Sequence, residues 1–159
     1  MIIIGIDPGS YNCGYGILEL SGRKIIAAGC ETIKAKQNQP LEERIGVIYD
    51  GLKKVLIEYQ PDAAAVEDIF FGKNIRSAFT LGHVRGAILL CLFRANIPIL
   101  QYSPRSVKSA VVGNGNAHKQ QVRYMVEKSL GLDLSKVSED AADGLAIALC
   151  HYNKIRMTL

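Results

Sequence analysis

The beginning of the chain carries its apolar side chains in short runs separated by turn residues. Ile2 to Asp7 is a run of mostly β-branched residues that stops at Pro8-Gly9, a pattern typical of a buried central strand. Two further runs, 13–20 and 24–34, flank Ser21-Gly22-Arg23. We expect these three segments to form an antiparallel β-meander.

The apolar period then changes to three or four residues. It runs from Pro40 to Tyr59 and predicts an amphipathic helix with proline near its first turn. A fourth strand of mostly small apolar residues is expected over 62–68, ending at Glu67 and Asp68. The remaining predicted elements are a long helix over 74–96, a strand over 97–102, a short helix opened by Ser103-Pro104, a helix from an Asn116 cap to Leu130, and a last helix over about 138–152.

This order of strands and helices indicates an α/β layer fold with a five-stranded mixed sheet, the first three strands antiparallel, flanked by helices. At 159 residues and 48% hydrophobic, the chain has the size of one globular domain, so we assign residues 1–159 to a single domain. The first residues lack the basic segment of a signal peptide. We expect no membrane-spanning segment and a cytoplasmic location.

The cysteines and the net charge identify no chemistry by themselves. Cys13, Cys30, Cys91 and Cys150 are scattered without a C-x-x-C pair, and we interpret all four as buried free thiols. The net charge of +4 suits a polyanionic partner but is common in proteins that have none.

The predicted long helix carries Ala78, Gly82 and Gly86 at intervals of four residues, which places a stripe of small residues on one face. A glycine inside a helix costs about 1 kcal/mol relative to alanine, so such a stripe favours the close approach of another helix. The spacing leaves open whether that helix belongs to the same chain or to a second copy.

Carboxylates end the first and the fourth predicted strands. Asp7 either begins the turn, where aspartate commonly accepts backbone hydrogen bonds, or is a buried charge that needs a partner. Glu67 ends the fourth strand in the same way, and the last helix opens with Glu139, Asp140 and Asp143. Acids favour helix N-termini, but the apolar residues that follow Asp143 indicate a largely buried helix. Asp143 shares a helix face with Asp140 and with Glu139, so spacing does not decide which of these two acids acts together with Asp143.

Four converging carboxylates repel one another strongly unless divalent cations neutralise them. Oxygen ligands suit Mg²⁺, for which Mn²⁺ can substitute. Two such ions about 4 Å apart stabilise the attacking and leaving oxygens of an in-line phosphodiester displacement. The acidic residues therefore predict a two-metal site for phosphodiester chemistry.

Five segments, taken together and in order, carry a resemblance to a known family. They are GIDPG at 5–9, VEDIFFGKN at 66–74, LGHVRGA at 81–87, GNGNAHK at 113–119 and EDAADGLAIA at 139–148. The chain resembles the RuvC family of crossover junction endodeoxyribonucleases, the bacterial Holliday junction resolvases of the ribonuclease H-like superfamily. The resemblance covers essentially the whole chain and implies a ribonuclease H-like fold.

The resemblance also implies a role for individual residues. The family's four metal-binding acids match Asp7, Glu67, Asp140 and Asp143, which selects Asp140 over Glu139. Two further matches, Lys108 and Lys119, are basic residues that act near the scissile phosphate, where a fixed cation stabilises developing charge. Without the resemblance, a lysine near a helix start is usually a solvated surface charge.

The DNA contacts implied by the resemblance lie around residue 70. Phe70 matches an aromatic residue that contacts bases close to the junction centre, a role that suits stacking, although spacing does not decide whether Phe70 or Phe71 is exposed. We interpret Lys73, Arg76 and Lys119 as further DNA contacts. A surface salt bridge is an equal alternative for Arg76.

Two residues depart from the family pattern. Asp68 stands where relatives usually carry Gln or Glu, which alters the charge beside Glu67. Gly144 stands where alanine is usual, a change that costs about 1 kcal/mol in helix propensity. Neither removes a predicted metal ligand. Arg85, like Arg76, is expected to contact either a phosphate or an acidic side chain.

The resemblance implies a homodimer that presents two equivalent sites to a four-way DNA junction. Each site would use metal-activated water to make one of two symmetric nicks in strands of like polarity, leaving 5′-phosphate and 3′-hydroxyl ends. The implied setting is bacterial DNA recombination and repair, alongside the RuvA and RuvB branch-migration proteins.

Three other functions fit parts of the sequence. One is another metal-dependent nuclease of the same superfamily, and a second is a non-catalytic junction-binding module. The third is a nucleotide-binding phosphotransferase, because GIDPG also resembles the phosphate loop of actin-like ATPases; those folds need two such domains, for which 159 residues are too few.

Overall fold

The fold is built on one five-stranded mixed sheet. The structure, a computed structural model, describes residues 1–68 and 74–158. The strands are β1 (Ile2–Asp7), β2 (Asn12–Ser21), β3 (Lys24–Lys34), β4 (Ala63–Glu67) and β5 (Ile99–Tyr102), in the order β3-β2-β1-β4-β5. β1, β2 and β3 pair antiparallel, and β1, β4 and β5 pair parallel. The predicted sheet is confirmed, and β1 lies at its centre.

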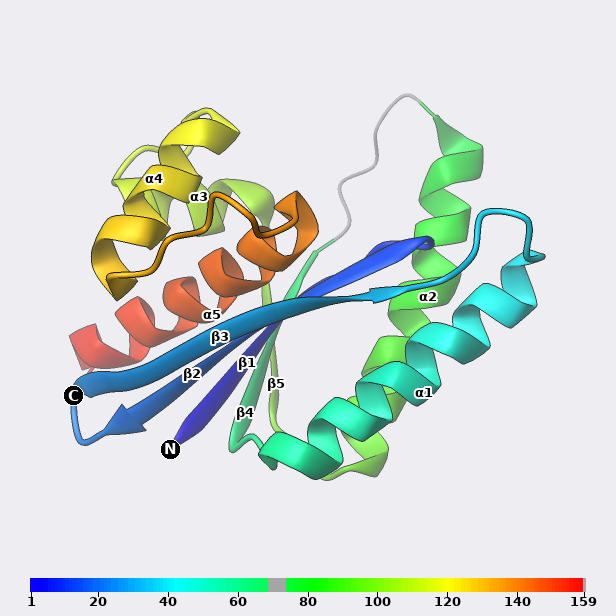
Figure 1. Ribbon diagram of the computed structural model, residues 1–159, viewed down its shortest axis with the longest axis horizontal. Helices are drawn as coiled ribbons and strands as arrows, with labels where there is room; N and C mark the ends of the chain where they lie inside the picture. Colours follow the sequence, from blue (N-terminus) through cyan, green and yellow to red (C-terminus); the bar gives the residue numbers. More distant parts are fainter. Residues whose placement is uncertain (69–73, 159) are drawn as a thin grey trace.

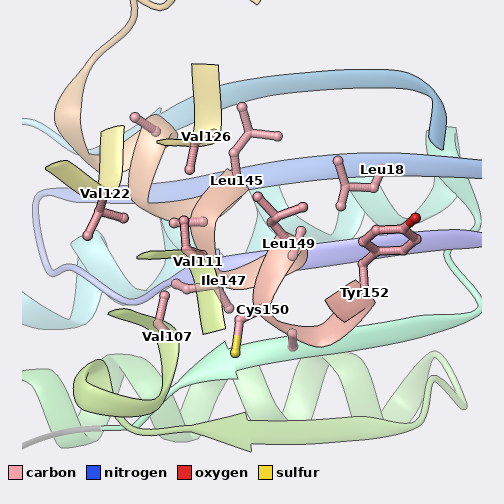
Figure 2. Packing of buried hydrophobic residues seen from close by; sticks show 14 of the residues in the cluster. Leu18, Val107, Val111, Val122, Val126, Leu145, Ile147, Leu149, Cys150 and Tyr152 are labelled. Carbon is pink, nitrogen blue, oxygen red and sulfur yellow. The ribbon is translucent and has the colours of Figure 1, made fainter. Parts of the chain in front are cut away.

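Helices cover both faces of the sheet (Figure 1). α1 (Leu41–Tyr59) and α2 (Ile75–Arg94) lie on one face, while α3 (Pro104–Val112), α4 (Lys119–Leu130) and α5 (Glu139–Thr158) lie on the other. Each face encloses its own apolar core, because successive side chains of a strand point to opposite faces. The core on the α5 side is shown in Figure 2.

The boundaries of two helices differ from those predicted. α4 is capped by His118, not Asn116: the backbone N–H of His118 donates to Gln121 Oε1 at 2.9 Å. α5 continues past Tyr152 to Thr158, and its later residues contact other parts of the chain: Nδ2 of Asn153 donates to the carbonyl of Ala110 at 2.9 Å. Tyr152 donates its hydroxyl proton to the carbonyl of Arg23 at 2.8 Å.

The prediction that all four cysteines are buried is wrong for one of them. Cys13, Cys91 and Cys150 are buried free thiols, whereas Cys30 is only partly buried. Cys30 lies on β3, one of the two edge strands of the sheet, where the side chain is covered less completely than on a central strand.

The outer face of α2 is not covered by the described part of the chain. Val84 and Ile88 face the core, whereas a Cβ placed on Gly82 or Gly86 would meet nothing within 4 Å. The small stripe therefore does not pack against another of the described helices. The same outer face carries the exposed apolar side chains Ile75, Phe79, Leu90 and Phe93.

Length and composition alone would also allow α2 to cross a membrane, since its mean hydropathy is 1.3. The inner face of the helix nevertheless belongs to the apolar core shared with α1 and the sheet. Packing in this core accounts for the apolar residues of the inner face, including Val84 and Ile88, without a bilayer.

Glycines allow α5 to lie directly against the sheet. Gly5 of β1 and Gly16 of β2 pair across adjacent strands beneath α5. A Cβ on Gly16 would lie 2.5 Å from the Cα of Leu145, and one on Gly144 would lie 2.6 Å from the backbone carbonyl carbon of Tyr15. Any side chain at these positions would push helix and sheet apart. Packing therefore accounts for Gly144, at the expense of helix propensity.

We expect Gly16→Ala to destabilise the protein by at least about 2 kcal/mol, because the added methyl group meets helix backbone that cannot rotate away. Gly29→Ala is the matched control, since a Cβ at this exposed position of β3 would meet nothing within 4 Å. The free energy of unfolding in urea measures both effects. Equal stabilities of the two variants would contradict the proposed backbone contact.

Candidate active site

Two carboxylates lie side by side at one end of the sheet. Asp7 is the last residue of β1, paired with Gly14 of β2, so its assignment to the following turn is wrong. β1 and β4 run parallel with Ile6 opposite Val66, which brings Asp7 and Glu67 to the same end of the sheet. Alternation along each strand points both side chains toward α5, like Ile3 and Ala65, which lie in the core on that side.

Three helices complete the site on this face. Asp143 lies one turn into α5, and its Oδ2 accepts a hydrogen bond at 3.0 Å from Nζ of Lys119, the first residue of α4. Lys108 projects from α3. These side chains surround a cavity of about 290 Å³, whose lining consists of Asp7, Glu67, Pro104, Val107, Lys108, Lys119, Val122, Asp143 and Ala146.

Burial and like charge make this cavity a poor place for ionised carboxylates. Burial, followed by the charges of Glu67, Asp143 and Asp140, raises the pKa of Asp7 to about 8. Burial and the charge of Asp143 raise the pKa of Glu67 to about 7, although Lys119 and Lys108 act in the opposite direction. Burial and the neighbouring carboxylates together therefore outweigh the stabilisation of the charged forms by the two lysines.

The nearby carboxylates also change the pKa of Lys119. Its hydrogen bond and charge interaction with Asp143 raise the pKa of its ammonium group, and Asp7 and Glu139 add to this effect. The side chain of Lys119 is 69% exposed and that of Asp143 is 32% exposed, so solvent screens the pair. The ion pair is open to rearrangement when another charge enters the cavity.

Asp140 lies one turn before Asp143, with its backbone against Gly14 of β2. Its charge is one of those that raise the pKa of Asp7, whereas Glu139 acts on Lys119. The structure therefore brings the charge of Asp140 toward Asp7. Helix spacing alone had not distinguished Asp140 from Glu139.

The donor set fits a hard divalent cation. Its oxygens belong to carboxylates whose negative charges the nearby lysines neutralise only in part, and such ligands suit Mg²⁺ or Mn²⁺. Within residues 1–68 and 74–158, no three or more His, Cys, Asp or Glu side chains form a ready-made cluster of metal ligands. The carboxylates are gathered around one cavity, but the ligand cage is not preformed.

The remaining predicted contacts fall just before and within α2 in the sequence. Phe70, Phe71 and Lys73 fall outside the described residues. Arg76 is exposed in the first turn of α2. Arg85 forms a salt bridge of 3.1 Å with Asp68, and its Nε donates to the carbonyl of Glu67 at 3.3 Å. The unusual Asp68 thus pairs with an arginine that also braces the backbone beside Glu67.

Sequence reasoning identified the charged residues but missed the walls of the cavity. Val107 and Val122 were recognisable only as apolar positions of their helices, and Pro104 only as a helix opener. The available signal was helical spacing: Pro104 precedes Lys108 by four residues and Val122 follows Lys119 by three, which puts each on the same face as its lysine, while Val107 lies three residues after Pro104. These apolar side chains lower the local polarity beside the carboxylates, which strengthens the electrostatic interactions of the buried groups.

Comparisons with known proteins agree with this geometry. Residues 3–151 match the sequence profile of the family described as crossover junction endodeoxyribonuclease RuvC. The relative from Chloroflexus aggregans is 45% identical over 95% of this chain and 92% of its own length, and that from Desulforamulus reducens is 42% identical over 95% and 93%.

A solved structure of a family member also superimposes on the whole fold. The RuvC of T. thermophilus in complex with a Holliday junction substrate aligns with a TM-score of 0.90 and 36% sequence identity, covering 99% of this chain and 96% of that one. The sheet order, the carboxylate cavity and these likenesses agree on a single assignment: the chain belongs to the RuvC family of crossover junction endodeoxyribonucleases, within the ribonuclease H-like fold.

Proposed function

We propose that the cavity bounded by Asp7, Glu67 and Asp143 is where this Holliday junction resolvase cuts DNA. Asp7, Glu67, Asp140 and Asp143 would hold two Mg²⁺ ions, with Mn²⁺ as a substitute. The observation that carries the proposal is the burial of these carboxylates next to one another: burial first, and then the charges of the neighbouring carboxylates, raise the pKa of Asp7 to about 8 and that of Glu67 to about 7. A site that remains short of positive charge is suited to cations brought by solvent and substrate.

Bound cations would supply activation of water and neutralisation of the developing phosphate charge. The residues of the chain then have distinct tasks. The carboxylates would hold the cations, and the lysines at 108 and 119, which line the same cavity, would hold phosphate oxygens. Hydrolysis would leave a 5′-phosphate and a 3′-hydroxyl, and paired symmetric nicks in strands of like polarity would resolve the junction.

DNA would extend from the cavity toward the beginning of α2. Phe70, Lys73, Arg76 and Lys119 are the contacts proposed along this path, with stacking by the aromatic ring and phosphate contacts by the basic residues. Partners in the cell would be RuvA and RuvB, and the location would be the bacterial cytoplasm.

A homodimer formed through α2 would give one active site for each of the two cuts. Its support is the uncovered outer face of this helix: Phe79 is 67% exposed and Phe93 73%, with Gly82 and Gly86 between them. Exposed large apolar side chains aligned on one helix face favour a protein interface, and the glycines permit close backbone approach.

Asp7→Asn is expected to bind a labelled four-way junction normally but to cut it at least about 1000-fold more slowly, because a neutral amide is a poor ligand for the cation. Cleavage is followed in Mg²⁺ and binding in EDTA. Glu139→Gln, an exposed acid beside Asp140, is the control and is expected to retain cleavage. Rapid cleavage by Asp7→Asn would refute the proposed role of this cavity, and equal cutting of linear duplex would favour a general nuclease.

The raised pKa values predict that the metal-free protein loses stability as pH rises. In the unfolded chain these carboxyl groups ionise near pH 4, whereas in the folded chain Asp7 and Glu67 stay protonated up to about pH 8 and 7. The folded state therefore binds more protons between these limits, and the free energy of unfolding falls from about pH 4 to 8.

Urea unfolding in EDTA at several pH values tests this. Asp7→Asn is expected to flatten the decline, and Mg²⁺ to stabilise the wild type more than the variant at pH 8. Glu19→Gln, an exposed acid of β2, should follow the wild-type curve. A free energy of unfolding that rises between pH 5 and 8 would contradict the predicted protonation.

Phe79→Glu is expected to convert the dimer to a monomer, because it places a charge in the centre of the proposed interface. Ile57→Glu is matched in exposure, 65% against 67%, but lies on α1. Sedimentation equilibrium measures the oligomeric state, and a supercoiled cruciform plasmid reports paired against single cuts. A wild-type monomer, or a Phe79→Glu dimer, would exclude α2 as the dimer interface.

A further inference from the structure

Arg44, in the first turns of α1, is a charged side chain that is only 8% exposed. Its Nη1 donates to the hydroxyl of Ser10 at 3.0 Å and to the carbonyl of Ser10 at 3.4 Å, and its guanidinium carbon lies 4.0 Å from the ring centroid of Tyr11. Within the described ranges, its Nε has no hydrogen-bond partner and no acidic side chain forms a salt bridge with it. Buried arginines are normally paired with an anion.

The side chain borders a cavity distinct from the one that holds the carboxylates. This second cavity has a volume of about 650 Å³ and is lined by Ser10, Tyr11, Leu41, Arg44, Arg76, Ser77, Thr80 and Leu81. Its lining comes from the turn between β1 and β2 and from the N-terminal turns of α1 and α2, the helices on one face of the sheet in Figure 1. We call it the Arg44 cavity.

The chemistry of the Arg44 cavity is that of an anion site. Among its described lining residues are two arginines and several hydroxyl groups, and none is acidic. The N-terminal turns of α1 and α2 both border it, so the positive ends of two helix dipoles reinforce the arginines. The planar donors of arginine match the oxygens of a phosphate.

The position of the cavity favours a phosphate of the substrate over a free anion. Ser10, which is hydrogen-bonded to Arg44, follows Asp7 by three residues, so the Cα atoms of Asp7 and Ser10 are at most about 11 Å apart. This corresponds to an axial rise of roughly three nucleotides of one DNA strand. A strand that presents one phosphate to the carboxylate cavity can therefore present a nearby phosphate here.

We propose that the Arg44 cavity binds a non-scissile backbone phosphate of the junction, with Arg44 and Arg76 as its ligands. This inference rests on the proposed function and adds a second anchor for the same DNA. Because Arg44 also bonds the turn that follows Asp7, phosphate binding there would hold the strand in register with the metal site. Arg44 is thus a DNA-binding and positioning residue outside the catalytic cavity.

Binding of a labelled four-way junction in EDTA, measured across a range of salt concentrations, tests the proposal. Arg44→Gln removes the ligand, and Thr80→Glu places a negative charge at the wall of the cavity while leaving Arg44 in place. Each is expected to weaken binding about tenfold and to reduce the slope of log affinity against log salt by about one. Arg94→Gln, at the opposite end of α2, is the control and should match the wild type.

A scan of single neutral methylphosphonates near the cut site identifies the phosphate. One non-scissile position is expected to weaken wild-type binding about tenfold and to have no further effect in Arg44→Gln or Thr80→Glu, because the contact is already lost. If no position shows this coupling, or if Thr80→Glu keeps wild-type affinity and slope, the proposal is wrong. Any loss of affinity in Arg44→Gln would then come from destabilising the turn to which Arg44 is hydrogen-bonded. A lower melting temperature of this variant would show that effect.

Cleavage of the junction by the wild type in Mg²⁺ separates this proposal from the one on which it rests. If the wild type cuts the junction and the variants bind like the wild type, only the Arg44 cavity is refuted. If the wild type binds the junction with the predicted coupling but does not cut it, the phosphate site stands and the catalytic assignment fails.

Discussion

The arrangement of the active site depends on the backbone contact between α5 and the two central antiparallel strands. At Gly5, Gly16 and Gly144 no side chain separates helix from sheet, so the two backbones come into direct contact there. Asp140 and Asp143 are carried by the first turns of that helix. Without this close approach, their charges would be too far from Asp7 to affect its pKa as they do.

The same contact creates a conflict between stability and function. Burial and like charge hold the pKa of Asp7 at about 8, so ionising the site without a cation costs folding free energy. A core with neutral residues at these positions would be more stable but would bind no metal. The apolar walls formed by Val107 and Val122 intensify the repulsion and equally intensify the attraction for a cation.

The two faces of the sheet carry different tasks. The α5 face holds the carboxylates and both lysines, whereas the α1–α2 face presents an uncovered apolar helix surface and a buried arginine beside the turn after Asp7. β1 connects the two, since its end supplies Asp7 to one face and leads directly to Ser10 on the other. Substrate binding and catalysis can therefore be coupled through one short turn.

The sequence by itself determined the strands, the helices and the identity of the acidic residues. Apolar periods of two and of three to four residues distinguish strand from helix, and the sequence places Asp7 and Glu67 at the ends of predicted strands. The pairing register of β1 with β4, which puts both side chains on one face, came from the structure. The resemblance carried by five short segments supplied the choice of Asp140 and the roles of the lysines.

Only the tertiary structure decided what each face meets. Arg44 falls three residues after Leu41 and four before Ile48, on the apolar side of its helix, yet this period could not reveal the turn and cavity that surround it. Likewise, the spacing of Gly82 and Gly86 did not show whether their face of the helix is buried or uncovered. A periodic pattern records which side of an element is apolar, whereas burial, charge and pKa depend on neighbours that come from distant parts of the chain.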